Sequence, residues 1–268
     1  MSTSSSFNRV YRKVITCILF MMLALGVSAQ HISYADSTVN AKLLKDTLAR
    51  HNSVLGYIPP AVFITYGLLS FPVKAIRQID YNVYNDMQAD HPGFKTKADN
   101  YLQYATIVAV YGFNAAGVKG KHRFVDRTAL LVLSEVIFGG TTFIGKRVTN
   151  RTRPSNGDNY SFPSGHTGNA FLAAEFMFQE YGDVSPWYGI AGYSVAATTG
   201  ILRVYNNAHW FSDVVAGAGG GILSAKVAYL IYPYIRPLFS SGKDDKNSMI
   251  IIPTYQNSTF GLTLVKNL

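Results

Sequence analysis

Three basic side chains in the middle of the chain, Lys146, Arg153 and Arg203, have the chemistry needed to hold a phosphoryl group. During phosphoryl transfer, negative charge spreads over the equatorial oxygens, and fixed positive donors stabilise that charge. Lys146 and Arg153 are about two helical turns apart, and Pro154 is expected to end their helix directly after Arg153. Alone, basic residues after an apolar segment more often flank a membrane interface, so this interpretation depends on two further clusters.

A tetrapeptide, Pro163-Ser164-Gly165-His166, precedes an apolar segment that begins at Thr167. The free backbone N–H groups at the start of a helix form an anion site, and glycine lets a phosphate approach the backbone closely. The Ser164 hydroxyl adds a donor, and His166 could protonate a leaving oxygen because its ordinary pKa is close to neutral. Taken alone, the tetrapeptide could equally be a helix cap followed by a surface histidine.

His209 and Asp213 are four residues apart, which places both side chains on one face of a helix. The carboxylate can then hold one imidazole N–H and fix its tautomer, which leaves the other ring nitrogen free to attack phosphorus. Alone, such a pair is more often a structural hydrogen bond. Arg203 precedes His209 by six residues and is expected to bring positive charge to the same place.

Other kinds of site have weaker support in the sequence. This scheme requires no metal and no other cofactor, because the histidines and acidic residues are too dispersed to form a persuasive zinc site and no nucleotide-binding glycine loop is present. The single cysteine, Cys17, excludes a disulfide framework. The net charge of +9 could suggest nucleic acid, but the basic residues are not interleaved with aromatics, so an anionic small group or a lipid headgroup fits better.

Apolar segments longer than a typical strand must position these residues, which predicts helices. They span residues 54–70, 101–118, 128–145, 167–178, 186–202 and 211–232. Pro163, Pro186 and Pro233 lie where such helices are expected to start or stop. The chain is 48% apolar and only 15% charged, which points towards a membrane. We therefore predict an all-α bundle of about six helices, embedded in a membrane.

Counting crossings gives an expected orientation. If segments 101–118 and 128–145 form one pair of crossings and 167–178 and 186–202 form another, the three clusters emerge on one face of the membrane. The basic loop 119–127 then lies on the opposite face, and positively charged loops favour the cytoplasm. The site is therefore expected to face the periplasm, on the outer side of the inner membrane.

Segment 54–70 does not fit this count, since a further full crossing would reverse the orientation. Pro59-Pro60 near its start favour a place in the interface or a fold back. The alternative is a soluble, exported helical bundle in the periplasm, because hydrocarbon disfavours polar groups. Such groups within the segments are Gln103, Asn114, Glu135 and Lys226.

The N-terminus predicts an export signal. Basic residues precede an apolar run from Val14 to Val27, and Val27-Ser28-Ala29 provide small residues for cleavage. We expect residues 1–29 to be a signal peptide, with an uncleaved anchor as the alternative.

The rest of the chain is expected to form three parts. Residues 30–100 form an N-terminal helical or interfacial region with a solvated connection, Asp80–Asn100, that covers the site. Residues 101–236 form the core. Residues 237–268 form a tail in which Met249–Ile252 and Phe260–Val265 predict a β-hairpin.

The three clusters resemble a known signature. Lys146-x6-Arg153-Pro154, Pro163-Ser164-Gly165-His166 and Arg203-x5-His209-x3-Asp213 are similar, in type and order, to the motifs of the type 2 phosphatidic acid phosphatase (PAP2) and vanadium haloperoxidase superfamily. The resemblance covers about residues 101–232 and implies a PAP2-like helical core. It also implies a phosphohistidine intermediate on His209, with His166 as the acid for the leaving group and Asp213 orienting His209. The residues implied to hold the phosphoryl oxygens are Lys146, Arg153, Ser164, Gly165 and Arg203. Leu202 departs from the pattern, since many members have Ser or Gly there, and this leaves the substrate class open.

The resemblance implies a phosphatase acting on a lipid phosphate or pyrophosphate at the periplasmic side of the membrane. Phosphatidic acid, undecaprenyl diphosphate and a phosphorylated glycolipid are candidate substrates. A soluble exported acid phosphatase and a vanadate-dependent haloperoxidase are the alternative enzymes. A non-enzymatic membrane assembly protein with a vestigial site is the alternative from another class, against which the intact His166, His209 and Asp213 argue.

Overall fold

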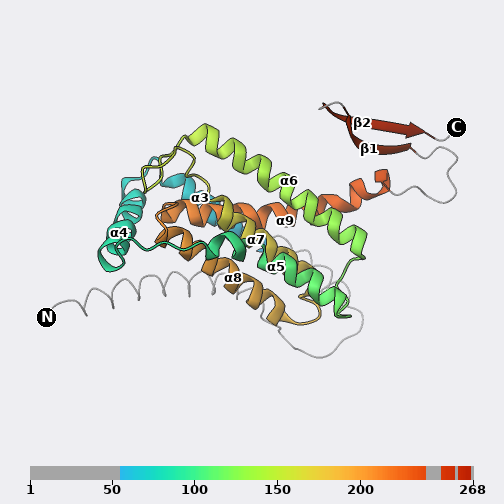
Figure 1. Cartoon of the computed structure of the whole chain (residues 1–268), viewed down its shortest axis with the longest axis horizontal. Helices are drawn as coiled ribbons and strands as arrows, with labels where there is room; N and C mark the ends of the chain where they lie inside the picture. The colour runs from blue at the N-terminus through green and yellow to red at the C-terminus, as the bar shows by residue number, and fades with distance from the viewer. Residues whose placement is uncertain (1–54, 240–248, 257–258, 267–268) are drawn as a thin grey trace, which may run out of the picture. The chain divides into compact units, whose positions relative to one another are not determined.

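The computed structural model describes residues 55–239, 249–256 and 259–266 (Figure 1). Its helices are α3 (Ile58–Leu69), α4 (Lys74–Asp90), α5 (Ala98–Ala115), α6 (Phe124–Thr149), α7 (Gly165–Tyr181), α8 (Pro186–Tyr205) and α9 (Phe211–Phe239). The expected all-α architecture is confirmed for residues 55–239, with seven helices in that range instead of about six. The predicted signal peptide lies outside the described residues.

Sequence signals account for the starts of two helices. α8 begins at Pro186 directly after Ser185, whose hydroxyl accepts a hydrogen bond from the backbone N–H of Trp187. α7 begins at Gly165, two residues after Pro163. Both starts lie where the prolines predict them.

The third proline was expected to mark a helix boundary, and this expectation is wrong. Pro233 lies inside α9, which continues through a second proline, Pro237, to Phe239. A proline removes its own N–H and displaces the carbonyl one turn earlier. Neighbouring groups can compensate for these losses, so a long helix can continue past a proline.

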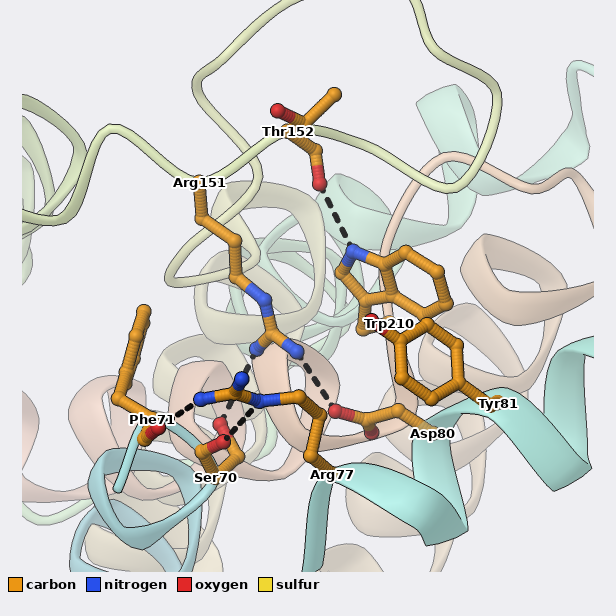
Figure 2. Close-up of a pocket in the computed structure, with 8 residues that line it drawn as sticks. All are labelled: Ser70, Phe71, Arg77, Asp80, Tyr81, Arg151, Thr152 and Trp210. Atoms are coloured by element: carbon orange, nitrogen blue, oxygen red, sulfur yellow. Dashed lines mark hydrogen bonds and ion pairs between the residues drawn. The ribbon is translucent and has the colours of Figure 1, made fainter. Parts of the chain in front are cut away.

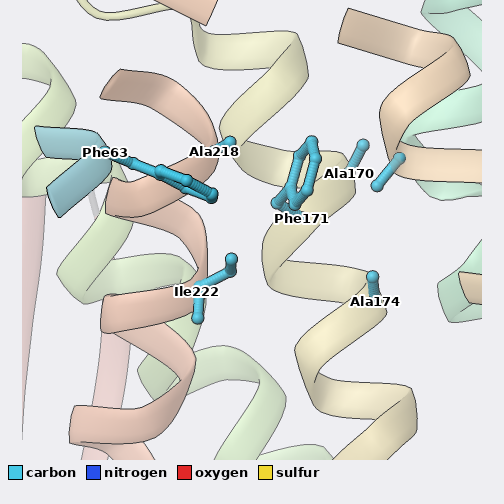
Figure 3. Close-up of a cluster of buried hydrophobic side chains, with 7 residues drawn as sticks. Phe63, Ala170, Phe171, Ala174, Ala218 and Ile222 are labelled. Atoms are coloured by element: carbon cyan, nitrogen blue, oxygen red, sulfur yellow. The ribbon is translucent and has the colours of Figure 1, made fainter. Parts of the chain in front are cut away.

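The central helix of the bundle is α7, and nearly all of its side chains are buried. It contacts α5, α6 and α8. Side chains of α3, α7, α8 and α9 form one apolar cluster around it (Figure 3): Phe63, Ala170, Phe171, Ala174, Ala196, Ala218 and Ile222. Burying a phenylalanine side chain contributes roughly 1.5–3 kcal/mol. Because Ser164 and His166 lie at the start of α7, this packing also fixes part of the candidate site.

Glycines of α9 let neighbouring segments approach its backbone closely. A Cβ atom added at Gly217 would lie 2.5 Å from the carbonyl oxygen of Ser164, and one at Gly219 would lie 2.6 Å from that of Pro60. Real Cβ atoms do not come so close to a backbone oxygen, so each position requires glycine. The start of α7 therefore rests directly on the backbone of α9.

A buried ion pair connects α6 with the end of α7. Arg127 and Glu180 are each 1% exposed, and Arg127 Nε lies 3.0 Å from Glu180 Oε2. The Nδ1 atom of His122 lies 2.7 Å from the other carboxylate oxygen. The positive charge of Arg127 is therefore balanced inside the protein, and it adds little to the surface charge of the loop 119–127.

Two helices of the described chain, α6 and α9, are individually long and apolar enough to cross a membrane. Apolar side chains of α6 such as Val136, Phe143 and Val148 are more than half exposed. Large exposed apolar side chains along one helix are typical of a surface that faces lipid. This finding supports a membrane protein. Within the described residues, two helices have this length and composition, fewer than the six apolar segments of the sequence.

Helices α3 and α4 together are also long and apolar enough to cross a membrane, but they bend by 90° at the break between them. Such a bend occurs in a broken span and in a re-entrant loop. The expectation that segment 54–70 lies in the interface or folds back stays a prediction.

The chain divides into two compact units, residues 1–226 and 227–268. The second unit contains the strands β1 (Met249–Gln256) and β2 (Thr259–Lys266), which pair antiparallel with Met249 opposite Lys266. The predicted hairpin falls in this unit.

Candidate active site

The three sequence clusters come together where α6 and α8 end and α7 and α9 begin. Lys146 lies in the last turn of α6, Ser164 precedes the first residue of α7, and Arg203 lies in the last turn of α8. His209 lies between α8 and α9. The loop that follows α6 reaches this histidine, because Arg153 Nη1 lies 3.2 Å from His209 Nε2.

Arg153 does not share a helix with Lys146, and the predicted helix end is therefore wrong. α6 ends at Thr149, four residues earlier than expected, and Asn150 adopts a left-handed backbone conformation with φ of 43°. Asparagine is one of the few residues that adopt this conformation readily, and it commonly ends helices. The two cations thus reach the site from different elements, and Lys146 Nζ donates a hydrogen bond to the Tyr160 carbonyl at 2.6 Å.

The imidazole of His209 is 2% exposed and is held by a backbone carbonyl. Its Nδ1 atom lies 2.6 Å from the carbonyl oxygen of Ser161, so this nitrogen carries the proton and donates it. Nε2 is then unprotonated and accepts from Arg153. Burial lowers the pKa of His209 to about 4, so the ring is neutral at neutral pH. A neutral imidazole with an unprotonated Nε2 is the form that can attack phosphorus, once the donor of Arg153 turns from Nε2 to a phosphoryl oxygen.

Asp213 does not bond to this imidazole directly. Its Oδ2 atom lies 3.8 Å from His209 Nδ1, which is too far for a hydrogen bond. The carboxylate accepts instead from Arg151 Nη1 at 2.7 Å, from the Trp210 N–H at 2.9 Å and from the Ser161 hydroxyl. Ser161 therefore connects the two residues, since its hydroxyl bonds to Asp213 and its carbonyl to His209. Asp213 acts on the orientation of the ring through Ser161.

The two arginines of the site have acidic partners and keep further donors. Arg153 Nε donates to Asp158 Oδ1 at 2.7 Å, and this hydrogen bond lowers the pKa of Asp158. Arg203 Nη1 donates to Asp99 Oδ2 at 2.6 Å, and Asp99 is 1% exposed. The Nε atom of Arg203 is buried and has no hydrogen-bond partner in the described part of the chain. A phosphate oxygen is a suitable acceptor for this donor.

The start of α7 offers backbone space for an anion, but the Ser164 hydroxyl has another partner. Ser164 is fully buried, and its Oγ lies 2.9 Å from the Thr167 hydroxyl oxygen. Either hydroxyl can be the donor of this bond, so a role of Ser164 in holding phosphoryl oxygens stays a prediction. A Cβ atom added at Gly165 would meet no atom within 4 Å. The backbone at this glycine borders open space at a helix N-terminus, where anions bind.

His166 is the second histidine of the site, and its Nε2 lies 2.9 Å from Asn100 Oδ1. Burial lowers the pKa of His166 to about 4. Nearby charges also act on it: Arg203, Arg153 and Lys146 lower this pKa, and Asp99 raises it. A bound phosphate would counter the three positive charges and raise the pKa of His166. Protonation of this ring is thus linked to the presence of an anion.

Arg151 connects the site to α4 (Figure 2). Its Nη2 lies 2.7 Å from Asp80 Oδ2, while Nη1 bonds to Asp213. Asp80 is 1% exposed and also accepts hydrogen bonds from the backbone N–H and the hydroxyl of Ser212. Through Arg151, α4 therefore helps to hold the Asp213 carboxylate in place.

The expectation that Asp80–Asn100 forms a solvated connection is wrong. Most of this stretch is helical, and Asp80 and Asp99 are both buried because each carboxylate pairs with an arginine of the site. One sequence signal could have identified α4. Apolar residues recur at helical spacing at Ile76, Ile79, Val83 and Met87. Arg151 and Asn100 carry no comparable signal. Within the described residues, no three His, Cys, Asp or Glu side chains are grouped to hold a metal ion.

The chain is similar to known proteins. Residues 127–237 match the PAP2 superfamily. A "Lipid A 1-phosphatase" of Porphyromonas gingivalis is 31% identical over 225 residues, which cover 82% of this chain and 51% of that protein. The PAP2 match includes every residue of the three sequence clusters. The chain spans about half the length of the Porphyromonas gingivalis relative. A solved PAP2-type phosphatidylglycerolphosphate phosphatase from Bacillus subtilis superposes with a TM-score of 0.45 at 18% identity, over 66% of this chain and 97% of that one.

Several residues of the candidate site lie outside the stretch that matches the PAP2 superfamily. Asp80, Asp99 and Asn100 all precede residue 127, where the match begins. They are nevertheless the partners of Arg151, Arg203 and His166 respectively. Helices that precede the PAP2 match therefore supply the outer layer of the site.

Proposed function

We propose that the chain is a PAP2-type phosphatase that hydrolyses a phosphate or pyrophosphate monoester of a lipid through a phosphohistidine on His209. The observation that carries this proposal is the state of the His209 ring. Its Nδ1 proton is fixed by the Ser161 carbonyl, and its Nε2 lone pair lies 3.2 Å from a cationic donor of Arg153. This arrangement suits a nucleophile beside a phosphate-binding group.

In the first step, Nε2 of His209 attacks phosphorus. An N–P bond forms, the P–O bond to the lipid breaks, and His166 gives its proton to the leaving oxygen. The ring of His209 becomes positively charged, and its Nδ1–H keeps the bond to the Ser161 carbonyl. Donors of Arg153, Arg203 and Lys146 stabilise the charge that spreads over the equatorial oxygens.

In the second step, water attacks the phosphohistidine. The neutral His166 takes a proton from this water, an O–P bond forms and the N–P bond breaks. Inorganic phosphate leaves, and His209 returns to its neutral form. The two steps together consume one water and release one phosphate, and they leave both histidines in their starting states.

The name of the Porphyromonas gingivalis relative supports a phosphorylated saccharide lipid as the first substrate to test. Phosphatidic acid and undecaprenyl diphosphate are the other candidates. The apolar, exposed surface of α6 fits an enzyme that meets its substrate within a membrane. Basic residues that remain at the surface of the loop 119–127 favour a cytoplasmic position for this loop, and hence a periplasmic site.

Phosphate release from detergent-solubilised substrates tests the activity. We expect the wild-type chain to release phosphate from at least one of the three lipids and His209→Ala to release none. Arg147→Gln is the matched control, because Arg147 follows Lys146 but lies over the rings of Phe143 and Tyr160. Release from a soluble ester alone, or bromide oxidation with added vanadate in place of phosphate release, would contradict a lipid phosphatase.

Labelling with a membrane-impermeant thiol reagent tests the orientation. Asp158 lies in the loop of the site and its side chain is half exposed. In a Cys17→Ser background, Asp158→Cys should react from the periplasmic side of intact inner-membrane vesicles or spheroplasts. Reaction only after the membrane is made permeable would place the site in the cytoplasm.

A further inference from the structure

A second hollow of about 250 Å³ lies beside the candidate active site. Its walls include Phe71 at the break between α3 and α4, Arg77 and Tyr81 of α4, and Arg151, Thr152 and Trp210 (Figure 2). Two of these residues are chain neighbours of the catalytic groups, since Thr152 precedes Arg153 and Trp210 follows His209. The Trp210 indole N–H donates to the Thr152 carbonyl at 2.8 Å. The hollow therefore lies against the backbone that carries Arg153 and His209.

The cation of this hollow that has no acidic partner is Arg77. Its Nε donates to the Ser70 carbonyl at 3.1 Å, and Nη2 donates to the Phe71 carbonyl. Among the described residues, no carboxylate lies within ion-pair distance of Arg77. A guanidinium has five N–H donors, so further donors remain after these two bonds. The two carbonyls also fix the orientation of the group, which lowers the entropy cost of binding.

The other charged groups at the hollow are paired with one another. Arg151 is paired with Asp80 and Asp213, at 2.7 Å in each case. The Asp80 carboxylate is 1% exposed, and its oxygens accept from Arg151 and Ser212. It therefore presents little negative charge to the hollow. In the part of the chain that the structure describes, Arg77 is therefore the cation of the lining that has no carboxylate partner, and the aromatic rings of the lining provide an apolar wall for the body of a headgroup.

We infer that this hollow binds a second phosphate group of the substrate, one that is not hydrolysed, with Arg77 as the cation that holds it. The inference rests on the proposed function. It makes the preferred substrate a lipid whose headgroup carries two separate phosphates. A phosphate on a neighbouring lipid has the same chemistry, so the experiment must distinguish the two sources.

The test compares two substrates in neutral detergent micelles, using the purified full chain. One is a saccharide lipid with two phosphate monoesters, and the other lacks only the phosphate that is not hydrolysed. We expect the wild type to have a lower KM for the first. Arg77→Gln should raise the KM for the first substrate about tenfold, which corresponds to one lost hydrogen bond to a charged group, and should leave kcat unchanged. Its KM for the second substrate should stay within about twofold of the wild-type value. Arg77→Lys should recover part of the loss, and Lys74→Gln on the same helix should change neither KM.

The outcomes separate this inference from the proposed function. Equal wild-type KM values for the two substrates would overturn the inference even if Arg77→Gln failed to fold. Equal effects of Arg77→Gln on both substrates would also overturn it. A third outcome is that Arg77→Gln raises KM for the singly phosphorylated substrate only after an anionic lipid is added. That result would show that the hollow binds the phosphate of a neighbouring lipid, and it would overturn the inference that the phosphate belongs to the substrate. No phosphate release from either substrate, with release from phosphatidic acid or undecaprenyl diphosphate, would overturn the inference alone. No release from any of these lipids would instead overturn the proposed function.

Discussion

Replacing Asp213 by asparagine should reduce stability and activity together. The carboxylate accepts hydrogen bonds from Arg151, Ser161 and Trp210 in a fully buried position. Asparagine keeps one acceptor oxygen and puts an amino group in place of the other, so at least one of these donors loses its acceptor. A buried donor without an acceptor costs about 1–3 kcal/mol, and more when it is charged. Since Arg151 keeps Asp80, we expect the free energy of unfolding to fall by about 2–4 kcal/mol.

The same substitution should lower kcat by about 10–100-fold, which corresponds to one lost bond to a charged group. The reason is indirect, because Asp213 holds Ser161 and the carbonyl of Ser161 holds the His209 ring. The assay measures phosphate release and chemical unfolding on the same detergent-purified samples. Ser161→Ala is the matched variant. It removes the hydroxyl that connects Asp213 to the Ser161 carbonyl but leaves the carboxylate with Arg151 and Trp210, so it should reproduce the loss of kcat with a smaller loss of stability.

One result would refute this reasoning. If Asp213→Asn were as stable as the wild type and lost more than about a thousandfold in kcat, the carboxylate would act directly on the imidazole, as in a catalytic triad. Unchanged kcat and unchanged stability would also contradict the role derived from these contacts.

Three further predictions concern the charges around the site. His166 donates its proton when charged, so activity should fall as the pH rises through the pKa of His166. Positive neighbours lower this pKa in the free enzyme, and bound phosphate raises it in the complex. The alkaline limb of kcat should therefore lie at higher pH than the alkaline limb of kcat/KM. Asp99→Asn should move the alkaline limb of kcat/KM to lower pH, since Asp99 raises the pKa of His166, and an unmoved limb would contradict this. Arg127→Met should lower the free energy of unfolding by about 3–5 kcal/mol, because it leaves Glu180 buried with one cationic partner fewer. Chemical unfolding measures this change, and an unchanged free energy would show that the ion pair contributes nothing.

Local patterns in the sequence predicted the parts of the fold that depend on local chemistry. Proline positions gave the starts of α7 and α8, and long apolar segments gave the helices. The end of α6 was predicted too late, because the left-handed conformation of Asn150 ends the helix before the proline is reached. This conformation is set by the loop that carries Arg153 to His209, which the spacing of basic residues does not reveal.

The candidate site was predicted in its central residues and missed in its outer layer. The three clusters meet in space, but Asp80 bonds to a residue 132 positions away and Asp99 to one 104 positions away. Such pairs depend on how α4 and α5 pack, so no local pattern indicates them. The i,i+4 spacing of His209 and Asp213 suggested a direct bond. The distance of 3.8 Å and the intervening Ser161 replace that bond by an indirect connection.

Trapping the covalent intermediate tests the proposed mechanism most directly. The purified chain would be mixed with a lipid substrate that carries a ³²P-labelled phosphate, denatured in alkali within a single turnover, and digested for mass spectrometry. We predict an acid-labile, alkali-stable phosphoryl group on the peptide that contains His209, and none in the His209→Ala variant. Phosphate release with no label on His209, or with label on a different residue, would contradict a nucleophilic role for this histidine.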